Sequence, residues 1–150
     1  SPYAMLNRNL KWLGLSMLFS AVLDLLLVLV ALAFPAWLGI VMGLNLDLGE
    51  PVLFRFWALV HLVFPCFCVL AWMDPKRNIA VISGAIMARL IYALFMFALV
   101  LFGGAATAWV VAGAVSLVLA GLHYVLLRSS DFGFWEVFSR AGNPPTIRMR

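Results

Sequence analysis

The sequence predicts an all-α integral membrane protein, an up-down bundle of four transmembrane helices followed by a short interfacial C-terminal helix. Of the 150 residues, 66% are hydrophobic and only 11% are charged. A soluble domain is typically about 45–50% apolar and about 25% charged. The apolar residues form four long runs, which are separated by turn-forming residues at Pro35, Asp74-Pro75 and Gly103-Gly104. A chain of this length predicts a single domain.

We expect the bundle to occupy residues 1–128, with spans at about 12–34, 52–73, 78–102 and 105–127. The first span has roughly 23 residues, or about 34 Å of helix, which is enough to cross a hydrocarbon core of about 30 Å. Residues 35–51 are too short and too rich in glycine to cross, so we expect them to lie in the interface. Pro65 should kink the second span because it frees the carbonyl one turn earlier.

Residues 129–150 are predicted to form an arm outside the bundle. Ser130 or Asp131 can cap a helix over residues 131–140, which Gly142 and the following prolines would end. Its aromatic side chains are predicted to contact either the lipid headgroups or a partner subunit. They are Phe132, Phe134, Trp135 and Phe138.

The basic residues predict the orientation of the chain in the membrane. With four spans, both termini lie on one side, and that side collects eight basic residues against Arg55 alone on the other. The eight are Arg8, Lys11, Lys76, Arg77, Arg128, Arg140, Arg148 and Arg150. Cytoplasmic loops carry such an excess, so the sequence predicts cytoplasmic termini in a bacterial-type inner membrane or a plasma membrane. Since topology explains these charges, a nucleic-acid partner is not expected.

One polar residue of each span is predicted to lie near the midplane. Asp24 is about 18 Å from the cytoplasmic edge, and His61, Arg89 and Ser116 are each about 16 Å from it. An unpaired charge at this depth costs at least about 2.5–3.5 kcal/mol. We therefore expect Asp24 and Arg89 to face each other inside the bundle, with His61 nearby. The layer is either a structural ion pair that fixes helix register or a site for a proton or ligand.

The sequence identifies no cofactor, metal site or catalytic motif. A haem bridging His61 and His123 is not expected, because these residues differ in depth by roughly 10 Å while axial ligands approach one iron from opposite faces. The pattern favours a non-catalytic accessory or structural subunit of a larger membrane complex over an enzyme. The alternative is a small transporter or binding protein for a proton-coupled or hydrophobic ligand, using Asp24, His61 and Arg89.

Overall fold

The computed structural model describes residues 2–43 and 50–134, and the side chains of 4–43 and 52–134. The described residues form helices and turns and contain no strand. The helices are α1 (Pro2–Ala33), α2 (Pro35–Val41), α3 (Glu50–His61), α4 (Val63–Met73), α5 (Ile79–Gly103) and α6 (Ala108–Ser129).

Within residues 2–43 and 50–134, four helical segments are long and apolar enough to cross a membrane, which suggests a membrane location. They are Ala4–Ala33, Val52–Met73, Ile79–Gly103 and Ala108–Ser129. The predicted spans agree with them except at two starts. α1 begins at Pro2 rather than near Trp12, because the residues between include strong helix formers such as Ala, Met, Leu, Arg and Lys. α6 begins at Ala108, after a turn that is longer than predicted.

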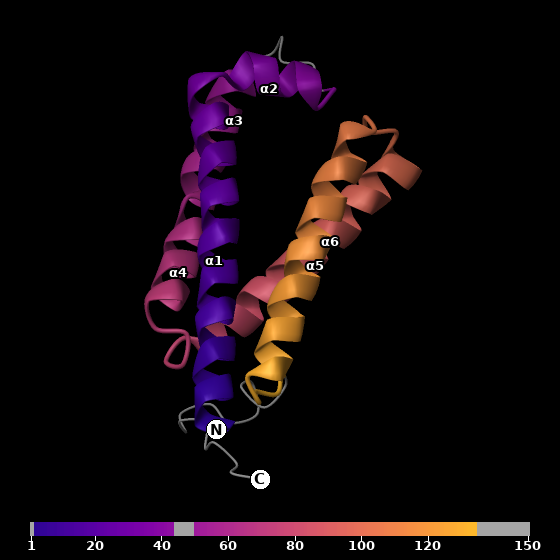
Figure 1. The fold of residues 1–150 in the computed structure, drawn as a ribbon. Coiled ribbons are helices and arrows are strands. Elements are labelled where there is room, and N and C mark those ends of the chain that lie inside the picture. The colour runs from indigo at the N-terminus through magenta and orange to yellow at the C-terminus, as the bar shows by residue number, and fades with distance from the viewer. Residues whose placement is uncertain (1, 44–49, 135–150) are drawn as a thin grey trace.

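The helices form two arms joined at one end (Figure 1). α1 is the longest helix, and α3 and α4 run beside it as the first arm, while the antiparallel pair α5 and α6 forms the second arm and inclines away from α1. α2 lies across the far end of α1 and extends toward the second arm. The segment predicted to be interfacial therefore contains a short helix, and its residues 44–49 lie outside the described residues.

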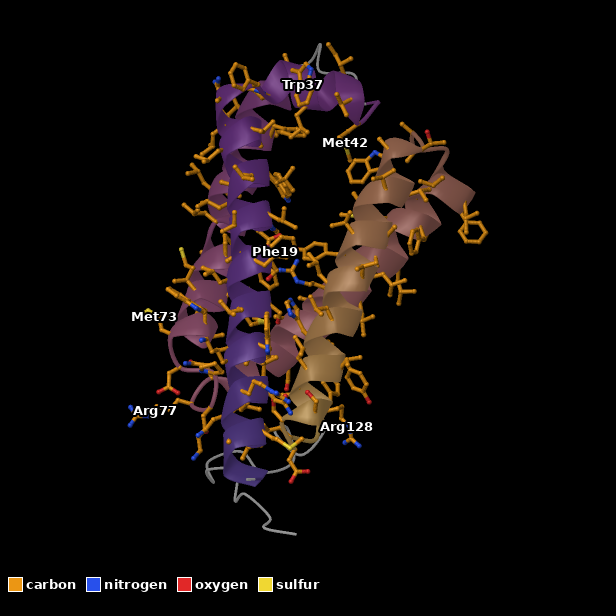
Figure 2. The ribbon with its side chains drawn as sticks, viewed as in Figure 1. Phe19, Trp37, Met42, Met73, Arg77 and Arg128 are labelled. Carbon is orange, nitrogen blue, oxygen red and sulfur yellow. The ribbon has the colours of Figure 1, made fainter. Side chains whose placement is uncertain are left out.

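We name the two ends of the bundle by what they contain. The basic half comprises residues 8–21, 64–86 and 119–134, and the α2 half comprises residues 28–43, 52–62 and 94–118. The start of α1, the turn after α4 and the end of α6 meet in the basic half (Figure 1). Arg77 and Arg128 lie at this end and Trp37 and Met42 at the other, as Figure 2 shows.

The basic half holds the larger apolar core, to which all the long helices except α3 contribute. Its buried members are Leu13, Met17, Ala21, Cys68, Ala71, Ile79, Ile82, Ala85, Ile86, Leu127 and Phe132. Hydrogen bonding also ties this end together, because Asn9 Nδ2 donates to the carbonyl of Ser129 at 2.8 Å. The two arms are therefore firmly packed where the basic residues gather.

The α2 half holds a smaller cluster built from α1, α2 and α3. Val28, Ala31, Leu38 and Ala58 are its buried members, and none of its described residues comes from α5 or α6. Gly113 is the single buried residue in the stretch 94–118. The second arm is therefore packed on itself here, and its outer surface is left to the surroundings.

α2 is the link between the two arms at this end. The indole Nε1–H of Trp109, at the start of α6, donates to the carbonyl of Met42 at 2.9 Å. Gly43 has a φ of +68°, and a Cβ on it would lie 2.5 Å from the Cβ of Ala106. A glycine is required there both for the left-handed backbone and for the close approach.

Proline interrupts the second span in the predicted place. α3 ends at His61 and α4 begins at Val63. Pro65 has no N–H with which to bond the carbonyl of His61, and the next amide, that of Cys66, reaches the carbonyl of Leu62 at 3.5 Å. The interruption therefore lies beside His61.

The chain after α6 differs from the predicted interfacial helix as far as the structure describes it. Residues 131–134 are turn and coil, and Asp131 has a φ of +66°. This reversal brings Phe132 back into the core of the basic half, where it is 7% exposed. Phe134 packs against the same core and meets Tyr124 edge-on at 6.3 Å between ring centroids. Trp135, Phe138 and the rest of the predicted helix lie outside the described residues.

Candidate functional site: a polar layer between two apolar clusters

Asp24 on α1 and Arg89 on α5 form a two-pronged ion pair between the two arms. Arg89 Nη2 donates to Asp24 Oδ2 at 2.7 Å and Nη1 donates to Oδ1 at 3.4 Å. The side chains are 5% exposed for Arg89 and 13% for Asp24. A fork of this kind fixes both distance and orientation. The structure thus brings together the two residues that the depth count placed opposite each other.

Arg89 has further contacts that hold its guanidinium in place. Its Cζ lies 5.0 Å from the centroid of the Phe64 ring on α4, a cation–π geometry. The hydroxyl of Ser116 on α6 donates to the backbone carbonyl of Arg89 at 2.8 Å. Ser116 therefore belongs to the layer, but it supports the α5 backbone and does not contact the ion pair through its side chain.

His61 completes the layer and lies in an aromatic surround. Its Nε2 is 4.0 Å from Asp24 Oδ1, beyond hydrogen-bond distance. The imidazole stacks on Trp57 at 5.2 Å with an interplanar angle of 20°, and the rings of Phe64 and Tyr92 lie 5.9 Å and 6.1 Å away. The three polar side chains predicted to share one depth are therefore gathered around the Asp24 carboxylate.

His123 forms a second polar contact that the sequence reasoning did not predict. It is fully buried, and its Nδ1 lies 2.9 Å from Ser16 Oγ. Because the Ser16 hydroxyl already donates to the carbonyl of Leu13 at 2.7 Å, the geometry assigns Nδ1–H of His123 as the donor to Ser16. One signal was available: His123 lies seven residues after Ser116, so both project from one face of a helix.

Several buried polar atoms in this interior have no partner among the described residues. They are His61 Nε2, Ser83 Oγ, Arg89 Nε and His123 Nε2. Buried polar groups are nearly always bonded to protein or to internal water. These atoms come from α3, α5 and α6 and extend from the ion pair into the basic half, so polar atoms line the interior beyond Asp24 and Arg89.

In the described part of the chain, no group of three or more His, Cys, Asp or Glu side chains is arranged to hold a metal ion. His61 approaches Asp24 whereas His123 pairs with Ser16, so the two histidines belong to different polar contacts.

No protein-family model, characterised protein or solved structure matches this chain.

Proposed function

We propose that the chain is an integral membrane protein with its basic half at the cytoplasmic side. The segments that carry five of the basic residues meet at that end, which supports the positive-inside assignment; the five are Arg8, Lys11, Lys76, Arg77 and Arg128. A cysteine replacing Lys76 should be labelled by a membrane-impermeant reagent from the cytoplasmic side alone, and one replacing Asp47 from the outside alone. The reverse pattern would contradict the orientation.

We propose further that it acts as a non-catalytic subunit of a larger membrane assembly. The observation that carries this proposal is the uneven packing of the two arms. A self-contained bundle would close along its whole length. Here only one residue of the stretch 94–118, a glycine, is buried, and the α2-half cluster contains no described residue of α5 or α6. A transmembrane helix of a partner, packed against the exposed apolar faces of the two arms, is the element that would cover this surface.

In this role the polar layer is structural. The fork between Asp24 and Arg89 sets the register of α1 against α5 at the depth where the arms separate. The hydrogen bond from Ser116 ties α6 to the same point of α5. The open half is thereby held at a fixed angle, ready to receive a partner without rearrangement.

Two adjacent leucines of α1 provide a matched test of the partner. Leu27 lies one turn beyond Asp24 on the same helix face, and Leu26 projects to the other side; both are exposed, at 40% and 54%. A photoreactive amino acid at Leu27 should give one discrete adduct with a membrane protein that also co-purifies at fixed stoichiometry with the unmodified chain. The same group at Leu26 should react with lipid. Lipid adducts alone at both positions would overturn the proposal.

The surroundings of His61 favour a second candidate function, a small proton-coupled transporter or a binding protein for a hydrophobic ligand. His61 Nε2 has no hydrogen-bond partner among the described residues and lies 4.0 Å from the Asp24 carboxylate, so a proton or a polar ligand group has room to bridge the two side chains. Vesicles containing the protein and a pH-sensitive dye should then show proton flux that His61→Gln abolishes. Equal flux in the two preparations would remove this candidate.

A further inference from the structure

A cavity of about 200 Å³ lies outside the polar layer, at the end of the basic half between α1 and the turn that follows α4. It is lined by Leu10, Lys11, Gly14, Leu15, Trp72, Asp74, Pro75 and Lys76. Its lining is mostly apolar and includes two exposed lysines from different segments of the chain.

The net charge of the residues that line the cavity is positive. Asp74 is the one acidic lining residue, and its carboxylate already pairs with Arg77, whose Nε lies 3.5 Å from Oδ2. The same carboxylate also accepts the backbone N–H of Arg77 at 3.2 Å. Lys11 and Lys76 are exposed and have no acidic partner among the described residues. An anion would therefore meet two free ammonium groups.

One wall of the cavity is formed where α1 and the turn after α4 lie close together. Gly14 permits this close approach, since a Cβ there would lie 3.0 Å from Pro75 Cγ and 3.2 Å from the carbonyl oxygen of Trp72. Trp72 and the nearby Trp12 are both exposed, and tryptophans are enriched at the level of the lipid headgroups. The cavity thus lies at headgroup depth in a chain that spans the membrane.

We propose that this cavity binds the headgroup of an anionic glycerophospholipid, with the phosphate between Lys11 and Lys76 and the glycerol part against Trp72 and Leu15. This proposal rests on the membrane location proposed above. Basic pockets between helices on the cytoplasmic side suit acidic headgroups. The volume accommodates a headgroup but not a pair of acyl chains, which extend along the exposed apolar surface of α1 and α4.

The test compares lipids on the delipidated protein in detergent. Native mass spectrometry with phosphatidylglycerol and with phosphatidylcholine of the same chains should show selective binding of the anionic lipid. Losing both lysines in Lys11→Gln/Lys76→Gln should weaken that binding by about 30-fold, from the typical contribution of a basic residue near an acidic surface. Arg8→Gln/Arg128→Gln removes the same charge at the same end outside the cavity and should bind as the wild type does.

Further variants and probes distinguish the possible outcomes of this experiment. Lys11→Arg/Lys76→Arg should retain binding, and inorganic phosphate should not displace the lipid. Photoreactive phosphatidylglycerol should label the wild type within residues 10–15 or 72–76, which tests the site even if the glutamine variant fails to fold. Equal binding of the two lipids, or labelling elsewhere, would overturn the proposal. A chain that remains in water without detergent would instead overturn the membrane location itself.

Discussion

The two halves of this bundle use the same helices and pack them differently. In the basic half, α1 presents Gly14, Ser16, Ser20 and Ala21, all buried, and the arms close around a continuous core. Where the α2 half approaches, the same helix presents consecutive leucines at 25–27, all exposed. Small residues let helix backbones approach, whereas bulky ones hold them apart. The comparison teaches that closure of this bundle is set locally, by side-chain size.

The ion pair stands at the boundary between the halves, and breaking it should have the largest effect. Asp24→Asn or Arg89→Leu alone should cost about 3–5 kcal/mol of unfolding free energy, because each leaves a buried partner unpaired. The double variant should recover part of this loss. Unfolding in mixed micelles would measure both.

An exposed pair supplies the control for this experiment. Asp74 and Arg77 are 47% and 87% exposed, so Asp74→Asn should cost no more than about 1 kcal/mol. If Asp24→Asn lowered the free energy of unfolding no more than Asp74→Asn does, the ion pair would not be what holds the two arms together. If the double variant were stable yet inactive in a functional assay, the layer would be a site and not only a structural contact.

A smaller effect is expected from the second polar contact of the basic half. Ser16→Ala removes the acceptor of His123 Nδ1–H and leaves a fully buried imidazole unsatisfied, at a cost of about 1–3 kcal/mol. Ser129→Ala is the matched control, because Ser129 is exposed and its hydroxyl donates only to the carbonyl of Leu126 in its own helix. Equal stability of the two variants would show that the polar interior contributes nothing to closure.

Two helical glycines compare the halves directly. Gly14→Ala should destabilise the protein by about 1 kcal/mol, since the gain of helix propensity is exceeded by a clash with Pro75 and the Trp72 backbone in a packed region. Gly113→Ala places a Cβ 2.9 Å from the ring of Phe97, but that ring can move because residues 94–118 are loosely packed. Its stability should change little. Equal losses at both glycines would mean that the α2 half is as tightly packed as the basic half.

A similarly small effect is expected at the link between α2 and α6. Trp109→Phe removes the indole donor to the Met42 carbonyl and should cost about 0.5–1.5 kcal/mol. Its sharper consequence is geometric: spin labels on α2 and α6 should show a broader distance distribution. An unchanged distribution would show that α2 does not hold the second arm.

Much of this architecture could be predicted from the sequence because it depends on local patterns. Apolar run length places the four spans, Pro65 places the interruption of the second, and counting residues from the ends brings Asp24, His61 and Arg89 to one depth. These inferences need only the rise of a helix and the cost of an unpaired charge in lipid.

The features that could not be predicted depend on how the helices pack against one another, and the sequence of a single segment does not determine this. The separation of the arms follows from side-chain sizes summed over two surfaces, and the burial of His123 requires knowing that its face of α6 turns toward Ser16. The return of Phe132 into the core depends on one residue, Asp131, in the left-handed region. The aromatic residues that follow Asp131 fit a surface helix as well as they fit a turn that returns to the core, so the sequence pattern alone does not distinguish the two.

The span of sequence between Asp24 and Arg89 has a consequence for biosynthesis. The two residues are 65 positions apart, so α1 leaves the ribosome well before its counter-ion exists. At about 5–20 residues per second, the carboxylate waits roughly 3–13 s for the guanidinium. For the membrane location proposed above, α1 would carry a penalty of about 2.5–3.5 kcal/mol during that interval, which its long apolar run must outweigh. Insertion of the first helix would thus come early and at a cost, and the arrival of α5 would remove that cost.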